Sequence, residues 1–395
     1  MQRRHRAWAE IDLAAFRSNL AAARQVAGNA QVWPVLKANA YGHGAQKLAL
    51  VCAEEGVHRI GVGDSSEALE LREAGIETPL LVLGTAIEAE LPALLRHGVE
   101  VGVHSEGKAR QFGQFATAQG TRLGVHLKVD TGMTRLGVMP QAVLRVAKAI
   151  AEEPGLELRG LMTHFPAPDG CNDPQTELQH LQTLQIADDI RQLGIPVPAV
   201  HCANSAALFS GLSPLADAVR PGIALFGILP PSLAAQTSLQ PVLSLHTQLV
   251  FLKDIPAGRA VGYGGVWTTH RPTRLATLPI GYADGVPYRL GTSGRGTVLV
   301  RGHRCPVVGA VSMDYCTIDV GHVPGATVGD TVTFIGRDGQ ESIGAQEIAD
   351  AVGTIPYEIT CSIGSRVRRV FHDAPQAAPS AAPAQLQASP AQAPD

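Results

Sequence analysis

The chain changes its hydrophobic period partway along. Over its first part, short apolar runs rich in Val, Leu and Ile alternate with segments of helical spacing. In residues 140–155, for example, Val143, Val146, Ala147 and Ile150 would share one face of a helix. The apolar runs lie at about 32–36, 59–62, 80–83, 99–103, 122–129, 157–163, 198–201 and 217–220. This series of strand–helix repeats matches a (β/α)8 TIM-type barrel, which typically has ~250 residues.

A doubly wound parallel sheet is the alternative for this part of the chain. In that fold a GxGxxG sequence usually follows the first strand and binds a dinucleotide. No such sequence follows the run at 32–36, so the pattern favours the barrel.

The pattern becomes β-rich after a Pro- and Ser-containing linker at 228–241. From about residue 242, strand-like runs follow one another between glycines and prolines, and helical periods are few. The last residues are mostly Ala and Pro without an apolar pattern, which is typical of disorder. We therefore expect a barrel over residues 1–240, a mainly-β domain over 241–372 and a disordered tail over 373–395.

Composition excludes several classes of partner. The net charge is -3, which gives no electrostatic case for a nucleic-acid or anionic-membrane partner. No apolar stretch approaches the roughly 18–20 residues of a membrane span, and no apolar segment of a secretory signal follows the basic start. The cysteines are scattered without a CxxC pair or metal-ligand spacing. We expect free thiols in a cytoplasmic protein and no metal site.

Reactive side chains follow five of the eight expected strands. Because barrel enzymes place their active sites at the carboxyl ends of the strands, these side chains should converge. Lysine is rarely buried, and loss of water favours its neutral, nucleophilic form. The residues at these strand ends are Lys37, Lys128 with Asp130, His164, His201 with Asn204 and Ser205, and Arg220.

Two of these segments suit an anion. Asn204 and Ser205 stand at an expected helix start, where free N–H groups attract phosphate. Gly222 and Ile223 offer backbone amides beside Arg220, and the glycine allows close approach. Taken singly, Ser205 reads as a plain helix cap and Gly222 as a tight turn. Together with a strand-end lysine in a barrel, they suggest pyridoxal 5'-phosphate (PLP), which needs a lysine, a group facing its pyridine nitrogen and a phosphate cradle.

Six motifs resemble those of bacterial alanine racemases, in the same order and over about residues 7–370. They are VLKANAYGHG (35–44), LKVDTGMTRLG (127–137), HCANSAA (201–207), VGYGG (261–265), LPIGYADG (278–285) and VSMDYC (311–316). The resemblance implies a homodimeric PLP enzyme of the fold-type III barrel family with shared active sites. It also implies interconversion of L-alanine and D-alanine, which would supply D-alanine for peptidoglycan.

The same resemblance assigns roles to individual residues. It implies that Lys37 carries PLP as a Schiff base, that Tyr263 is the second base, and that Arg220 faces the pyridine nitrogen with His164 nearby. The other implied contacts are Tyr41, Ser205, Gly222, Ile223 and Tyr357 for the phosphate, Arg135 and the Met313 backbone for the substrate carboxylate, Tyr282 and Tyr357 for a narrow substrate entrance, and Lys128 as a lysine that is often carbamylated and then pairs with Arg135.

Simple chemistry supports two bases. Racemisation removes a proton from one face of Cα and delivers one to the other, so two groups on opposite faces are the economical solution. A phenol with an ordinary pKa near 10 is a poor base at neutral pH. Cationic neighbours such as Arg220 and His164 would favour the phenolate of Tyr263.

The sequence departs from the family pattern at three places. Phe226 stands where many members have Tyr, and Ser312 precedes Met313 where some have Cys. The segment 164–170 carries two prolines in a loop that is usually less constrained. None removes a catalytic group, so these differences concern loop shape and specificity.

Three other functions remain possible at this point. A PLP-barrel decarboxylase would need no second base such as Tyr263. A racemase of broad specificity would relax the entrance, where Tyr282 and Tyr357 are both aromatic. A PLP-carrier barrel without robust turnover is usually a lone barrel, and the expected β domain argues against it.

Overall fold

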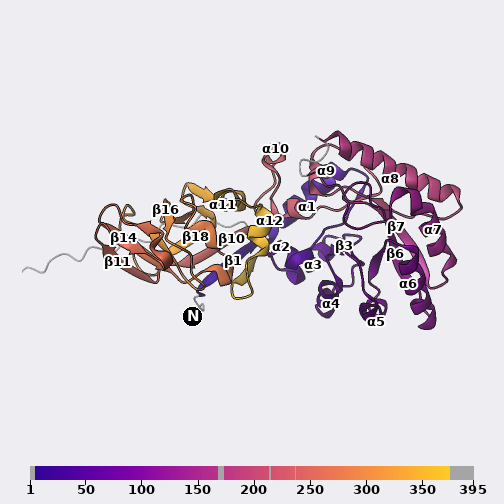
Figure 1. The fold of residues 1–395 in the computed structure, drawn as a ribbon, viewed down its shortest axis with the longest axis horizontal. Helices are drawn as coiled ribbons and strands as arrows, with labels where there is room; N and C mark the ends of the chain where they lie inside the picture. The colour runs from indigo at the N-terminus through magenta and orange to yellow at the C-terminus, as the bar shows by residue number, and fades with distance from the viewer. Residues whose placement is uncertain (1–4, 168–172, 213–214, 236, 374–395) are drawn as a thin grey trace, which may run out of the picture.

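The computed structural model describes residues 5–167, 173–212, 215–235 and 237–373. Two sequence expectations therefore fall at least partly outside the described residues: the tail, from residue 374 on, and the end of the proline-bearing loop, from residue 168 on. The described chain forms two parts that lie end to end, a helix-covered barrel and a mainly-β part (Figure 1).

The barrel has eight parallel strands in the order β2-β9-β8-β7-β6-β5-β4-β3. A parallel bridge between Val35 and Gly61 joins the β2 segment to β3 and closes the circle. The predicted barrel is thus confirmed, although the first expected strand, at 32–36, has regular pairing only at its start. The strands are β2 (Gln31–Val32), β3 (Ile60–Val62), β4 (Leu80–Val82), β5 (Glu100–Val103), β6 (Leu123–Lys128), β7 (Leu156–Met162), β8 (Val200–His201) and β9 (Ala218–Val219).

Helices surround the barrel because each buries one apolar face against it. In α7, Val143, Val146, Ala147 and Ile150 are all buried, as the spacing predicts. Helix α1 begins at a cap in which the Asp12 carboxylate accepts a hydrogen bond from the Ala15 N–H. The helices are α1 (Leu13–Ala27), α2 (Lys37–Tyr41), α3 (Ala45–Glu54), α4 (Ser65–Glu73), α5 (Leu91–Arg96), α6 (Glu106–Ala118), α7 (Val143–Glu152), α8 (Pro174–Gln192), α9 (Ser205–Phe209) and α10 (Pro231–Ala234), with 3₁₀ turns η1 (Glu88–Glu90), η2 (Pro140–Ala142) and η4 (Ile223–Phe226).

The second part is built on one large, mostly antiparallel sheet in the order β11-β14-β17-β16-β15-β18-β10-β1-β20, with β19 paired to β18. The predicted mainly-β domain is therefore confirmed. Its strands are β10 (Leu243–Gln248), β11 (Phe251–Ile255), β12 (Ala260–Val261), β13 (Trp267–Thr268), β14 (Thr273–Leu278), β15 (Thr297–Val300), β16 (His303–Val308), β17 (Cys316–Asp319), β18 (Thr331–Asp338), β19 (Glu341–Ile343) and β20 (Arg368–His372). Its helices are α11 (Ala345–Val352) and α12 (Pro356–Cys361), with 3₁₀ turns η5 (Tyr263–Gly265), η6 (Tyr282–Asp284) and η7 (Tyr288–Leu290).

One strand lies in a different part of the fold than its place in the chain suggests. Strand β1 (Ala7–Asp12) precedes the barrel, yet it pairs antiparallel with β10 and parallel with β20. The spacing along the chain predicts these residues as part of the barrel region, and their pairing with β10 and β20 corrects that prediction. Its alternating burial, with Ala7, Ala9 and Ile11 facing the core, suits a strand with one buried face.

Two features of the described residues concern membrane-spanning helices and the state of the cysteines. None of the helices in the described ranges is long and apolar enough to cross a membrane. The cysteines described there are free thiols: Cys52, Cys202, Cys305 and Cys316 are buried and Cys361 is exposed.

Candidate active site

Lys37 is followed by a left-handed backbone turn. It directly follows the segment that closes the barrel, and the next four residues, Ala38–Tyr41, have φ between 51° and 54°. Such left-handed residues cost roughly 1–2 kcal/mol each and rarely occur in series. The surrounding contacts must therefore hold this turn in place.

Two side chains hold the turn by its backbone. The Glu67 carboxylate accepts hydrogen bonds from the Ala38 N–H at 2.5 Å and from the Gly63 N–H at 2.7 Å. The buried His43 ring places Nδ1 3.0 Å from the Ala40 carbonyl oxygen and 2.9 Å from that of Tyr41. The lysine is thus presented from a preorganised loop rather than from a flexible one.

Cationic groups surround the Lys37 side chain. Burial lowers the pKa of Lys37, and the positive charge of Arg135 lowers it further. Burial, followed by the charges of Arg220 and Arg135, lowers the pKa of Lys128 to about 8. The same causes lower the pKa of His164 to about 3, so this imidazole is neutral at neutral pH, and the expectation of a cationic His164 is wrong. The cluster therefore holds an amine that loses its proton easily and offers positive charge to an anion.

Arg220 is buried and leaves one donor unused. Its Nη1 donates to the Nδ1 and carbonyl oxygen of His201, and its Nη2 donates to the carbonyl oxygens of Thr163 and Cys202. These bonds occupy four of the five N–H groups of the guanidinium. Among the described residues no acceptor pairs with the remaining Nε–H. This Nε is not among the fully buried atoms that lack a partner, so it faces open space in which an acceptor atom of a ligand can bind.

The expected phosphate contacts come together at η4. The Ser205 hydroxyl oxygen accepts hydrogen bonds from the Gly222 N–H at 2.9 Å and the Ala224 N–H at 3.2 Å. A Cβ on Gly222 would lie 2.2 Å from the Tyr41 hydroxyl, so only glycine fits beside this phenol. Ile223 is the first residue of η4, and its N–H has no partner within that turn.

Tyr357, from helix α12, completes this cluster. Its ring centroid lies 6.0 Å from that of Tyr41, which also packs on Phe226. The structure thus brings Tyr41, Tyr357, Ser205, Gly222 and Ile223 together at the end of the barrel that carries Arg220. The hydroxyl groups of Tyr41, Tyr357 and Ser205 and the free Ile223 amide can form a cradle for a phosphate.

Three expected site residues do not reach this cluster within one chain. Tyr263 in η5 is 77% exposed, and Met313 and Tyr282 are 53% and 45% exposed. All three belong to loops and turns of the second domain. Within the described residues, no hydrogen bond or ring contact joins them to Lys37.

Sequence reasoning missed some groups that shape the site. It did not select Glu67 or His43, because an acidic residue in the first turn of a helix and a buried histidine are both common structural features. It also missed Thr163 and Cys202, which act on Arg220 through their backbone carbonyls and leave no side-chain signal.

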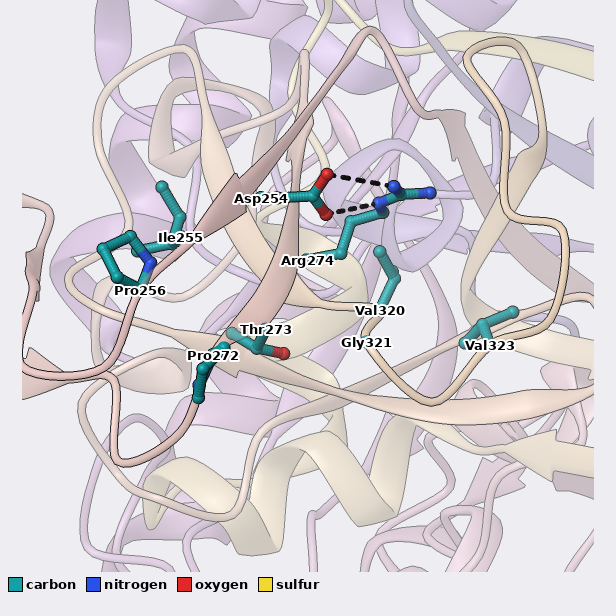
Figure 2. A pocket seen from close by; sticks show the side chains of 9 residues that line it. All are labelled: Asp254, Ile255, Pro256, Pro272, Thr273, Arg274, Val320, Gly321 and Val323. Carbon is teal, nitrogen blue, oxygen red and sulfur yellow. Dashed lines mark hydrogen bonds and ion pairs between the residues drawn. The ribbon is translucent and has the colours of Figure 1, made fainter.

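A separate pocket lies far from this cluster. It is bordered by β11 and β14 near the end of the second domain away from the barrel (Figures 1 and 2). Asp254 and Arg274 face each other across two hydrogen bonds of 2.8 and 3.0 Å there. None of the residues assigned above to catalysis or binding lines it.

The two-domain fold matches that of solved amino-acid racemases. A solved alanine racemase from a D-cycloserine-producing Streptomyces lavendulae shares 34% identity with a TM-score of 0.88 and covers 94% of this chain and 98% of its own. A histidine racemase from Leuconostoc mesenteroides shares 28% identity with a TM-score of 0.84 and covers 94% of this chain and 99% of its own.

Family models give a narrower assignment. The alanine racemase N-terminal domain model matches residues 11–230, and the C-terminal domain model matches residues 242–371. The alanine racemase of Methanococcus maripaludis is 38% identical over 371 residues, which is 93% of this chain and 99% of that protein. The alanine racemase of Desulfosudis oleivorans is 40% identical over 377 residues, which is 92% of this chain and 96% of that protein. The chain belongs to the alanine racemase family of isomerases.

Proposed function

We propose that this chain interconverts L-alanine and D-alanine with PLP bound at the Lys37 cluster. The observation that carries the proposal is the unused Nε–H of buried Arg220, which lies at the same barrel end as a lysine of lowered pKa and a phosphate cradle. PLP fits this set, because its pyridine nitrogen would accept from Arg220 and its phosphate would take the cradle. When bound through Lys37, the cofactor supplies an electron sink that acidifies the Cα–H of the amino acid.

The residues of the chain have distinct tasks in this proposal. Tyr41, Tyr357, Ser205, Gly222 and Ile223 would hold the phosphate. Arg220 would donate to the pyridine nitrogen and, as a permanent cation, disfavour a second positive charge there. His164 is neutral and would accept or donate a hydrogen bond beside it without adding charge.

Proton transfer would use two bases on opposite faces of Cα. The Lys37 amine, with its lowered pKa, is suited to one face. Arg135 and the Met313 backbone would bind the substrate carboxylate, and a carbamate on Lys128 would pair with Arg135. Carbamylation requires a neutral amine, which the pKa of about 8 at Lys128 makes accessible near neutral pH.

The second base would be Tyr263 of the partner subunit. In one chain this phenol is largely in water, where it would not be activated. Further large apolar side chains are exposed in the same domain, as expected of a protein–protein interface. These are Val266, Tyr288, Tyr315 and Ile355. A homodimer in which each second domain covers the partner's barrel would bury them and complete both sites.

Two experiments test the proposal. Borohydride reduction of the PLP-loaded protein followed by peptide mapping should place the pyridoxyl group on Lys37, and a label on Lys128 or Lys253 would contradict it. Lys37→Ala and Tyr263→Ala chains, each inactive in D/L-alanine interconversion, should regain part of the activity when mixed. Absence of complementation despite demonstrated subunit exchange would exclude shared sites.

The same assay addresses substrate choice. With Tyr282 and Tyr357 at the entrance, alanine should be racemised fastest, serine slowly and leucine negligibly, since steric walls discriminate better than the ~1–3 kcal/mol of one methylene in an open apolar pocket. Similar kcat/KM values for alanine and leucine would contradict a narrow entrance.

We also propose that the protein acts in the cytoplasm, where its free thiols would stay reduced, and supplies D-alanine for peptidoglycan.

A further inference from the structure

A row of buried polar side chains runs from Arg220 through the interior of the barrel. Arg220 Nη1 lies 2.8 Å from His201 Nδ1, and His201 Nε2 lies 2.8 Å from His126 Nδ1. His126 Nε2 then lies 2.9 Å from a carboxylate oxygen of Glu100. Both histidines are fully buried. Barrel interiors are normally filled with branched apolar side chains, so a continuous polar row there is unusual.

The hydrogen bonds of this row can run in only one direction. A guanidinium has donors and no acceptor, so His201 Nδ1 must accept from Arg220. The proton of His201 is then on Nε2 and is donated to His126 Nδ1. His126 must in turn carry its proton on Nε2, where the Glu100 carboxylate accepts it. Every link has one donor and one acceptor, with both imidazoles neutral.

Arg59 and Trp33 close the far end of the row. Arg59 donates to Glu100 at 2.9 Å and lies over the Trp33 ring, 4.3 Å from its centroid. Trp33 also packs on His201 with 4.7 Å between the ring centroids. The Glu100 charge is thus paired at the end of the row that lies away from Arg220.

The barrel makes room for this row at Gly160. In the β6–β7 pairing Gly160 stands beside His126, and a Cβ there would lie 2.7 Å from His126 Nδ1. The φ of Gly160 is not positive, so its backbone conformation does not itself require glycine. A Cβ would also lie 2.7 Å from the Ala199 carbonyl oxygen, so both the imidazole and the neighbouring strand need this space.

The lowered pKa values of His201 and His126 agree with neutral imidazoles in this row. Burial, followed by the charge of Arg220, keeps the pKa of His201 well below 6.5, and burial also lowers the pKa of His126. Burial raises the pKa of Glu100, but hydrogen bonds from His126 and Arg59 outweigh it and lower the pKa to about 2. Glu100 is therefore ionised and able to accept at any pH at which the enzyme would work.

We infer that Glu100 and His126 are positioning residues that fix the tautomer of His201 and thereby the orientation of the Arg220 guanidinium. In the opposite tautomer, an N–H on His201 Nδ1 would face an N–H of Arg220, and the guanidinium would move. The Nε–H that Arg220 presents to the cofactor would move with it. This inference rests on the role proposed above for Arg220.

The first test reads the tautomer directly. Histidine ¹⁵N shifts of the PLP-loaded protein, assigned with a His201→Asn variant, should show His201 neutral and protonated on Nε2. His126→Leu should convert His201 to a mixture of tautomers, whereas His126→Asn, which keeps an acceptor near the Nδ1 position, should restore the wild-type signal. An unchanged His201 signal in His126→Leu would overturn the inference.

The second test asks whether the row acts through Arg220. His126→Leu should weaken PLP binding about two- to tenfold, the value of one hydrogen bond. On an Arg220→Lys background the same change should add nothing. His246→Leu is the matched control, because His246 is also buried and hydrogen-bonded, to Thr333 at 3.0 Å, but lies in the second domain. It should lower unfolding stability without changing PLP affinity.

The outcomes separate this inference from the proposed function. Equal weakening by His246→Leu, or full additivity with Arg220→Lys, would reduce His126 to a structural role. Wild-type PLP affinity in Arg220→Lys would instead refute the role of Arg220 itself, and the inference with it.

Discussion

Replacing Gly222 by alanine tests the phosphate cradle with a single methyl group. The new Cβ would lie 2.2 Å from the Tyr41 hydroxyl and 2.8 Å from its Cζ, at least about 0.7 Å inside a normal carbon contact of ~3.5 Å. Tyr41 is 6% exposed and packed against Phe226 and Tyr357, so its ring has little room to retreat. The φ of Gly222 is -116°, so a left-handed backbone conformation is not the reason for glycine here, and the contact with Tyr41 is the effect under test.

The expected magnitude follows from these contacts. Overpacking of this kind costs typically ~1–3 kcal/mol of unfolding free energy. Loss of one hydrogen bond to a charged phosphate, worth about 1.5–3 kcal/mol, should weaken PLP binding roughly 10- to 100-fold. Urea unfolding of the PLP-free chain measures the first quantity, and PLP titration followed by visible absorbance measures the second.

Two further variants make the test specific. Gly107→Ala is the matched control, because a Cβ at Gly107 meets nothing within 4 Å and its φ is not positive. Tyr41→Phe removes the atom in closest contact, so adding it to Gly222→Ala should cost less stability than the two single changes predict by addition. If Gly222→Ala matches Gly107→Ala in both stability and PLP affinity, the steric reasoning is wrong.

Three other outcomes are expected from the same structure. Burial lowers the pKa of His43 to about 4 from an unfolded value of 6.5, so the unfolded state binds a proton first as the pH falls. The unfolding free energy should therefore fall below about pH 6.5, and this group should account for about 3 kcal/mol of the loss at pH 4. In urea unfolding, His43→Gln should reduce the slope of unfolding free energy against pH. An equal slope would exclude His43 as the cause. Glu67→Ala should speed amide hydrogen exchange at Ala38 and Gly63 and lower stability by ~1–3 kcal/mol, since it leaves both backbone donors without their acceptor. Unchanged exchange at Ala38 would show that the turn does not depend on Glu67. Arg366 donates two hydrogen bonds to Asp284 at 2.8 and 2.9 Å, so Arg366→Lys should lower the midpoint of thermal unfolding. An unchanged midpoint would mean that the pair contributes nothing.

The sequence predicted the barrel well because its signals are periodic and local. The apolar runs and the buried face of α7 follow from residue spacing alone. The sequence also predicts that the strand-end residues gather at one face, since parallel strands of a barrel end together. Strand β1 was misplaced because its partners, β10 and β20, lie far along the chain, and spacing carries no information about long-range pairing.

Within the site, side chains with reactive chemistry were predicted and their supports were not. Lys37 and Arg220 stand out by residue type and position. The left-handed turn after Lys37 is formed by Ala, Asn, Ala and Tyr, residues that give little local sign of it. The barrel row beyond Arg220 was also hidden, because His126 and Glu100 lie within strands rather than after them.

The position of β1 has a consequence for how the chain folds as it is synthesised. Its two neighbours in the sheet, β10 and β20, leave the ribosome only after the whole barrel has been made. At roughly 5–20 residues per second, β1 must wait on the order of 10–50 s for β10 and longer for β20. During that time its apolar face and both of its edges are unprotected. The barrel is thus an insertion into the β domain, and a nascent chain that stalls before residue 243 would expose a strand ready to pair with another molecule.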